Sequence, residues 1–332
     1  MQFCNLRALR GPGAARSLAR MKRHWQAVIL LVGAACSESG PTAPDPSAST
    51  GQLRLPILFP TAAPAALPAG PMTWHGGDIL VASKTLAIFW GRQWNDPNFV
   101  HDKIAAIDSF FQGWSNSDYA KVPTEYTGQN FVGATDMVTA ASTYTGHIID
   151  LTPAPTEVSP ADSFGLVMEE TVISEVCNVV GLPDPTTLYV VYATTVPGTG
   201  TYGGFHTFGN CQHQPVMVAL VLNLDNPAYG IGDSFTGHSA GLAVIADITA
   251  HELAETITDP RGTSWFATSG AGEIGDKCTF APGGGTAAAD TTFVTFSNGS
   301  HWHIQPLWSN HAYSLSAGYP NNNSELGCIF HQ

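Results

Sequence analysis

Apolar residues recur at helical spacing in three segments of the chain. In residues 97–114, Val100 and Ile104 begin a series of apolar side chains that recurs every three or four positions. This spacing predicts an amphipathic helix. Residues 160–183 and 240–258 show the same kind of pattern, so the sequence predicts three helices.

Continuous apolar runs predict the strands. They occupy residues 84–91, 186–194 and 215–224, and a shorter run occupies 147–151. Runs of this length that are rich in β-branched and aromatic residues are typical of buried strands. The glycine-rich residues 196–214 separate two of these runs.

Beyond Pro260 the chain is rich in loop-forming residues. Short strand candidates occur at 292–297, 301–308 and 311–316. Alternating helices and strands, followed by irregular structure stapled by cysteines, predict an α/β (α+β) fold with a central twisted mixed sheet. This single domain is expected to span residues 72–332.

The residues before this domain divide into three parts. Residues 1–20 precede a second Met and are interpreted as an over-extended gene start. Residues 21–36 have the basic, apolar and small-residue order of an export signal, with Cys36 at the lipidation position of a bacterial lipoprotein. Residues 37–71 are rich in Pro, Ala and Ser, which is typical of a linker. The sequence predicts an exported protein, lipid-anchored through Cys36 or secreted after cleavage near Ala35.

Composition narrows the class of function. The chain has 332 residues, of which 44% are hydrophobic, enough for a buried core. Seven basic and 26 acidic residues follow Cys36, a formal net charge of −19. A surface this negative repels phosphate backbones, so nucleic-acid binding is excluded from the expected functions.

The cysteines of the exported part predict disulfides. These are Cys177, Cys211, Cys278 and Cys328. An even number of cysteines in an oxidising compartment favours two disulfides, with all three pairings open. None of them has C-x-x-C spacing, so a thiolate-bound metal is disfavoured.

The segment HELAETITDP at 251–260 carries the main candidate chemistry. It matches the zinc-protease signature H-E-x-x-H except that Glu255 replaces the second His. His251 and Glu255 lie one helical turn apart, so both can bind one zinc ion. Glu252 stands where such enzymes carry the general base that activates water. The alternative is a helix edge whose charged residues face water.

A third ligand is expected on another element, because catalytic zinc usually has three protein ligands. The segment GEIGDKC at 272–278 offers Glu273 and Asp276, and His206 is another candidate. Oxygen ligands of this kind also suit calcium. Zinc is therefore the expected ion, with calcium as the alternative.

A rival motif lies just before this helix. GHSAG at 237–241 matches the serine-hydrolase pattern G-x-S-x-G. The residues before Ser239 form turns and not the strand that this motif requires, so Ser239 is interpreted as a helix N-cap. The serine hydrolase remains an alternative, with Asp259 or Asp276 and His301 or His303 as its acid and base.

Three further residues are candidates for substrate binding or for support of a metal ligand. They are His206, Asp259 and His303. In a strand, His301 and His303 share one face and can bind a metal ion or substrate together. The plainer interpretation of that segment is a half-exposed aromatic strand.

Several motifs in order resemble the phosphate-induced protein 1/EXORDIUM family. The resemblance runs from about Trp74 to Cys328 and includes YGGFHTFGNC, HELAETITDP, GEIGDKC and HWHIQPLW. It is strongest to the bacterial and fungal type, which carries the charged helix that plant members lack. The resemblance implies a secreted single-domain protein, and the helix adds a zincin-like motif by analogy.

These observations predict an exported zinc-dependent hydrolase, of the metallopeptidase type, that acts on a protein or peptide. The alternative is a non-catalytic surface domain that binds a cell-surface polymer and holds a structural calcium ion. Contact with a membrane is expected only through a lipid at Cys36.

Overall fold

The computed structural model describes residues 69–332, apart from 163–164, 199–201, 226–235, 268–271 and 280–292. The predicted gene start, the export signal with Cys36 and the linker up to residue 68 lie outside the described residues. All described residues belong to the unit Ser49–Gln332.

A five-stranded mixed sheet forms the centre of this unit. Its strand order is β5-β2-β6-β8-β7. Strands β5 (Ser142–Asp150), β2 (Ser83–Trp90), β6 (Thr187–Ala193) and β8 (Gln214–Val221) are parallel, and β7 (Gly204–Cys211) is antiparallel to β8 at one edge. The predicted α/β class and central mixed sheet are confirmed.

Strand β7 lies within the glycine-rich residues 196–214, for which the sequence predicts no strand. The two residues between β7 and β8, Gln212 and His213, have positive φ angles of 49° and 70°. Two such residues make the tight turn that matches the twist of a hairpin. The hairpin places His206 within an edge strand of the sheet.

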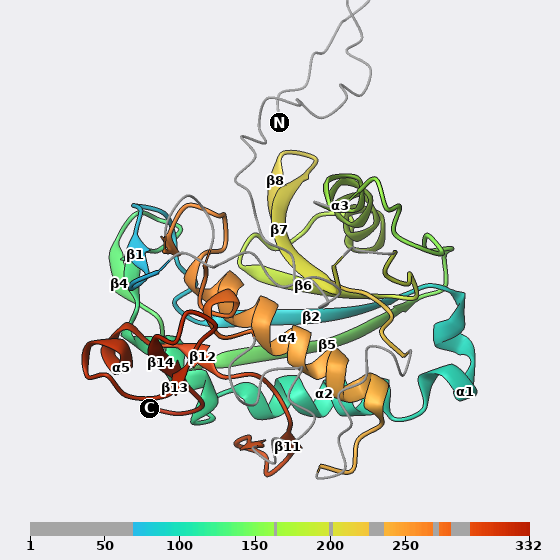
Figure 1. The fold of residues 1–332 in the computed structure, drawn as a ribbon. Helices are drawn as coiled ribbons and strands as arrows, with labels where there is room; N and C mark the ends of the chain where they lie inside the picture. Colours follow the sequence, from blue (N-terminus) through green and yellow to red (C-terminus); the bar gives the residue numbers. More distant parts are fainter. Residues whose placement is uncertain (1–68, 163–164, 199–201, 226–235, 268–271, 280–292) are drawn as a thin grey trace, which may run out of the picture. The chain divides into compact units, whose positions relative to one another are not determined.

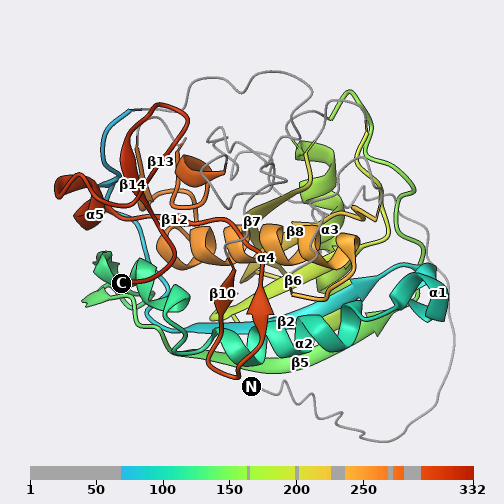
Figure 2. The same cartoon turned by 60° about the horizontal axis from the view of Figure 1, so that its bottom comes forward.

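Helices cover both faces of the sheet (Figures 1 and 2). Helix α3 (Leu166–Val180) packs on one face, and α2 (Lys103–Trp114) and α4 (Ala240–Thr258) pack on the other. Strand β6 is buried along its whole length, since its alternate side chains, such as Val190 and Val191, enter the cores on opposite faces. A strand covered on both faces reads as a continuous apolar run.

Two predicted helices differ from the observed ones at their N-terminal ends. Residues 97–114 form α1 (Pro97–Val100) and α2, separated at His101, whose φ of 47° breaks the helix. Helix α3 starts at Leu166 and not at residue 160. Helix α4 has the predicted bounds, and Ser239 caps it by accepting a hydrogen bond from the N–H of Leu242.

Short elements make up the rest of the described chain. The predicted strand at 311–316 is wrong, because Ser309 caps the short helix α5 (Asn310–Ser314) there. The predicted strand at 301–308 is two short strands, β11 (His301–Trp302) and β12 (Leu307–Trp308). The others are β1 (Thr73–Trp74), η2 (Arg92–Asn95), η3 (Tyr119–Glu125), β3 (Thr127–Gln129), β4 (Thr135–Met137), β9 (Trp265–Phe266), η5 (Asp276–Cys278), β10 (Val294–Thr295), β13 (Tyr319–Pro320) and β14 (Leu326–Ile329).

Two disulfides are present, as predicted, and the structure gives their pairing. Cys177–Cys211 joins α3 to β7, and Cys278–Cys328 joins η5 to β14. Disulfides of this kind are compatible with an exported protein. Among the described helices, none has the length and apolar character needed to cross a membrane.

Candidate metal centre

The charged residues of α4 are buried against the rest of the protein. His251, Glu252 and Glu255 are 0%, 2% and 3% exposed. Alanines on the same helix, among them Ala250 and Ala254, are also fully buried and allow its close packing. The alternative of a helix edge that faces water is therefore wrong. Buried ionisable groups of this number need a compensating charge or proton.

One group of possible ligands combines α4 with the GEIGDKC loop. His251, Glu255 and Asp276 offer ligand atoms that all lie within 4.8 Å of one another. His251 Nε2 lies 2.9 Å from Glu255 Oε1 and 3.7 Å from Asp276 Oδ1. The 2.9 Å contact lacks hydrogen-bond geometry, because Nε2 has no hydrogen-bond partner. These two atoms would have to separate slightly to bind one tetrahedral zinc ion, whose ligands lie about 3.3 Å apart.

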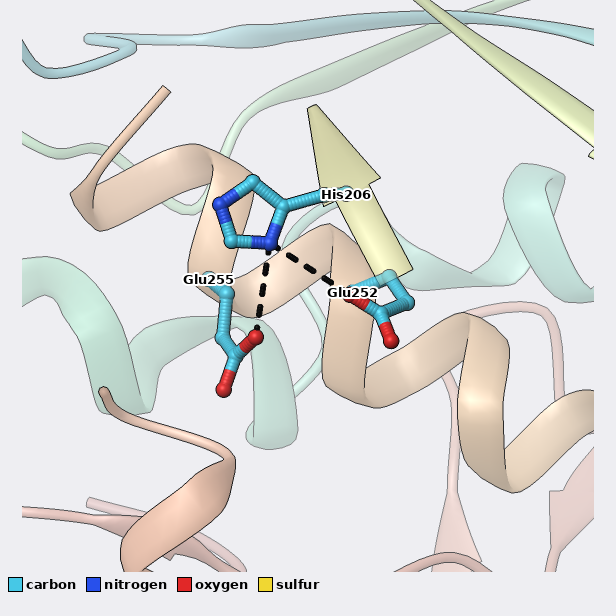
Figure 3. A group of neighbouring side chains, drawn as sticks. All are labelled: His206, Glu252 and Glu255. Atoms are coloured by element: carbon cyan, nitrogen blue, oxygen red, sulfur yellow. Dashed lines mark hydrogen bonds and ion pairs between the residues drawn. The ribbon is translucent and has the colours of Figure 1, made fainter. Parts of the chain in front are cut away.

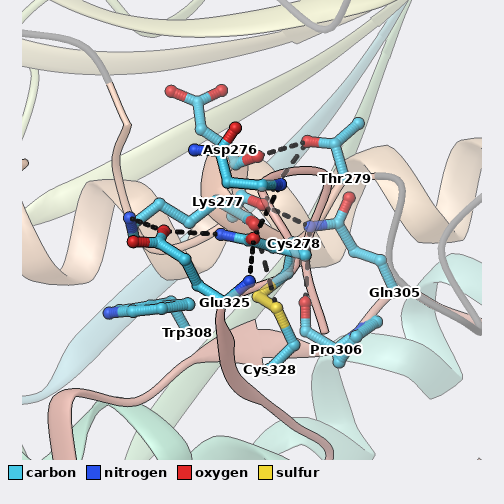
Figure 4. Close-up of a disulfide and its surroundings, with 12 residues drawn as sticks. Asp276, Lys277, Cys278, Thr279, Gln305, Pro306, Trp308, Glu325 and Cys328 are labelled. Atoms are coloured by element: carbon cyan, nitrogen blue, oxygen red, sulfur yellow. Dashed lines mark hydrogen bonds and ion pairs between the residues drawn. A yellow bond between two sulfur atoms is a disulfide. The ribbon is translucent and has the colours of Figure 1, made fainter. Parts of the chain in front are cut away.

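The loop is held against α4 by its backbone. The N–H of Asp276 donates to Glu255 Oε1 over 3.0 Å. A Cβ atom on Gly275 would lie 2.7 Å from the ring of His251, so only glycine allows this approach. The Cys278–Cys328 disulfide ties the same loop to β14 (Figure 4). The sequence left Glu273 and Asp276 open as the third ligand, and this geometry favours Asp276.

Gln305 fixes the proton of His251 on one ring nitrogen. Its Nε2 donates to the carbonyl oxygens of Gly275, at 2.7 Å, and Pro306, at 3.4 Å. Its Oε1 is therefore the oxygen that lies 3.1 Å from His251 Nδ1, and Nδ1 must carry the proton. Nε2, which faces Glu255 and Asp276, is then the ring nitrogen that has the free lone pair when His251 is neutral. This is the usual arrangement of a histidine that binds a metal ion.

A second group surrounds His206 on β7 (Figure 3). His206, Glu252 and Glu255 also have ligand atoms within 4.8 Å of one another. His206 Nδ1 lies 3.4 Å from Glu252 Oε2 and 3.4 Å from Glu255 Oε2. Its Nε2 lies 3.5 Å from Glu273 Oε2. Glu255 belongs to both groups, with one oxygen in each.

The acid–base properties of these residues reflect their burial and mutual charge. Burial and the Glu255 carboxylate raise the pKa of Asp276 to about 7. Burial also raises the pKa of Glu252. Burial opposes ionisation of Glu255 and of His251, but their attraction overcomes it, lowering the pKa of Glu255 and raising that of His251. The metal-free cluster therefore retains protons that a cation would displace.

Two other predicted site residues have structural contacts instead. The carboxylate of Asp259 accepts the N–H groups of Thr263, at 2.6 Å, and Ser264, at 2.8 Å, and so shapes the turn after α4. Ser239 Oγ donates to Asp102 Oδ1 over 2.9 Å and caps the helix.

The two histidines near the end of the chain do not share one face of a strand. Strand β11 ends at Trp302, so His301 is exposed and His303 is buried. Neither belongs to a ligand group among the described residues.

Gln305 and Gly275 support the site but were not singled out from the sequence. A signal for Gly275 was present, because glycine in a short acidic loop indicates close backbone approach. Gln305 had no such signal, since its partners come from segments distant in the chain.

Comparison with protein-family models, with characterised proteins and with solved structures finds no significant match. The resemblance to the phosphate-induced protein 1/EXORDIUM family therefore stays a prediction. What can be said of the class of protein rests on the site itself. It is an α/β protein with buried His, Glu and Asp groups that could hold a metal ion.

Proposed function

We propose that the protein is an exported zinc-dependent hydrolase of the peptidase type. His251, Glu255 and Asp276 would hold the ion. The observation that supports this most strongly is the pair of contacts of His251, whose Nδ1 donates to Gln305 while its Nε2 faces two carboxylates. A set of three protein ligands is also typical of catalytic zinc, which keeps a further position open.

Glu252 would act as the general base. Zinc in such a site polarises a carbonyl group and makes water more acidic. Glu252 is adjacent to the first ligand and buried among the same residues, and burial raises its pKa, which improves a carboxylate as a proton acceptor. It would take the proton of the attacking water and pass it to the leaving amine.

The expected substrate is a protein or peptide outside the cell. The disulfides are compatible with export, and the strongly acidic exported chain favours partners other than nucleic acids. Lipidation of Cys36 would place the protein at the cell envelope. Mass analysis of the mature N-terminus tests this part of the proposal.

The activity is tested with a single isosteric substitution. Wild-type protein and Glu252→Gln are each loaded with one equivalent of zinc and assayed on an unstructured protein substrate. We expect the wild type to cleave it and the variant to lose at least about 100-fold in rate, as for removal of a general base. Glu170→Gln, an exposed residue of α3, is the control and should keep full activity. Equal activity of Glu252→Gln and wild type would refute the assignment.

A second candidate function is a metal-braced binding domain without catalysis. The burial of Glu273 and Asp276, at 4% and 7% exposure, favours this alternative, since a structural site is closed to solvent. Here the ion, zinc or calcium, would stabilise the fold while another surface bound a cell-surface polymer. If the metal stabilises the fold but neither the wild type nor Glu252→Gln cleaves the substrate, the binding domain is supported over the enzyme.

A further inference from the structure

We infer that His206, Glu252 and Glu255 form a second cation site, and that an ion there inhibits the proposed hydrolase by binding its general base. The inference rests on the proposed function for the first ion and for the role of Glu252. The second site itself rests on the geometry of three buried residues from β7 and α4.

His206 Nδ1 makes a long contact with each of two glutamates, and the contact with Glu252 is within hydrogen-bond reach. Nδ1 lies 3.4 Å from one oxygen of each glutamate. Charge-assisted hydrogen bonds between imidazolium and carboxylate are shorter, about 2.7–2.9 Å. Two ligands of a tetrahedral zinc ion with bonds of about 2.0–2.1 Å are separated by about 3.3 Å. The 3.4 Å contacts around His206 are close to the second value, so this group could hold an ion.

The two groups offer places for two separate ions. They share Glu255, but among the described residues no ligand group contains both His206 and His251. Oε1 of Glu255 lies beside His251 and Oε2 lies beside His206. A carboxylate placed in this way bridges two ions, as in two-metal sites whose ions are about 3.5–4 Å apart.

The charge of the cluster is sufficient for two divalent ions, and it also determines which of them binds more tightly. Four buried carboxylates, of Glu252, Glu255, Glu273 and Asp276, surround the two histidines, and two divalent ions would balance them. The second ion enters beside an existing divalent charge and shares Glu255 with it. We therefore expect it to bind more weakly than the ion at His251.

The second ion would change the role of Glu252. As a ligand through Oε2, the carboxylate would be a weaker proton acceptor for water at the first ion, because the bound cation lowers its basicity. Zinc should therefore support activity at the first equivalent and inhibit it at the second.

Metal stoichiometry tests the second site without reference to activity. The metal-free chain is titrated with zinc by calorimetry, and the bound zinc is measured after gel filtration. His206→Ala removes the ligand that is unique to the second site. His301→Ala is the control, because His301 is an exposed histidine outside both groups. Circular dichroism confirms that each variant is folded.

We expect two equivalents in the wild type and His301→Ala, and one equivalent in folded His206→Ala. One equivalent in all three proteins would overturn the second site and leave the proposed function intact. Loss of all zinc in folded His206→Ala would overturn the separation into two sites. No zinc in the wild type would overturn both this inference and the proposed function. If two equivalents of zinc bind and hydrolysis is as fast with two as with one, the inhibitory role of the second ion is refuted.

Discussion

The amide oxygen of Gln305 accepts the Nδ1 proton of His251 across 3.1 Å, and this contact directs Nε2 toward two carboxylates. The two residues are 54 positions apart, so the fold is needed to bring them together. Gln305 is itself held by the carbonyl of Gly275, which lies in the loop that supplies Asp276. One side chain thus orients the histidine and holds the ligand loop.

Removal of this amide should weaken metal binding. In Gln305→Ala, the ring of His251 loses its acceptor and can rotate or change tautomer. We expect zinc affinity to fall about 10- to 100-fold, the usual effect of losing such a supporting contact. Competition with a chelator measures it, with Gln93→Ala on the exposed part of η2 as the control. Unchanged affinity in Gln305→Ala would contradict the role given to Gln305.

A methyl group on Gly275 should separate the loop from α4. The Cβ of Gly275→Ala would lie 2.7 Å from the His251 ring, so either the loop or the ring has to move. Overpacking of this kind costs about 1–3 kcal/mol of unfolding free energy. Urea unfolding measures that loss, and zinc affinity should fall as well. A variant with wild-type stability and affinity would show that the loop does not depend on this contact.

The metal-free protein should lose stability as the pH rises from about 4 to about 7. Burial and Glu255 raise the pKa of Asp276 to about 7, above its usual value of 3.8. The folded state then binds more protons than the unfolded state in this window, so the unfolding free energy falls with increasing pH. Glu252 acts in the same direction in this window, and His251 does so only above its usual pKa of 6.5.

Urea unfolding in the presence of a chelator at pH 5 and pH 7.5 measures this dependence. Asp276→Asn should flatten it, whereas Asp136→Asn, at an exposed position of β4, should not. A metal-free protein that is more stable at pH 7.5 than at pH 5 would contradict the account of the cluster.

The two disulfides should differ in their effect on the metal. Replacing Cys278 and Cys328 with Ser frees the ligand loop, whereas replacing Cys177 and Cys211 frees α3 from β7. Each loss should cost about 2–4 kcal/mol of stability. Zinc affinity should fall more in the first double variant. If the two double variants bind zinc with equal affinity, the disulfide that holds the ligand loop does not contribute to zinc binding.

The bounds of α4 could be predicted from the sequence because local signals agreed. Ser239 is a good N-cap, apolar residues follow at helical spacing, and Pro260 comes just after the end. The pairing of His251 with Glu255 follows from the same helix, since i and i+4 side chains lie on one face.

Elements that depend on distant contacts could not be predicted. Strand β7 lies in a glycine-rich segment without a continuous apolar run, and its pairing with β8 makes it a strand. The segment at 311–316 alternates like a strand, yet capping by Ser309 makes α5 there. The choice of Asp276 over Glu273 depends on how the loop folds over α4, which spacing along the chain does not encode.

Anomalous diffraction at the zinc absorption edge would locate the ion of the proposed metal centre. In crystals grown with one equivalent of zinc, we predict a peak within about 2.0–2.2 Å of His251 Nε2 and of one carboxylate oxygen each of Glu255 and Asp276. Absence of a peak at these atoms, or a peak bound by His206 without His251, would contradict the account.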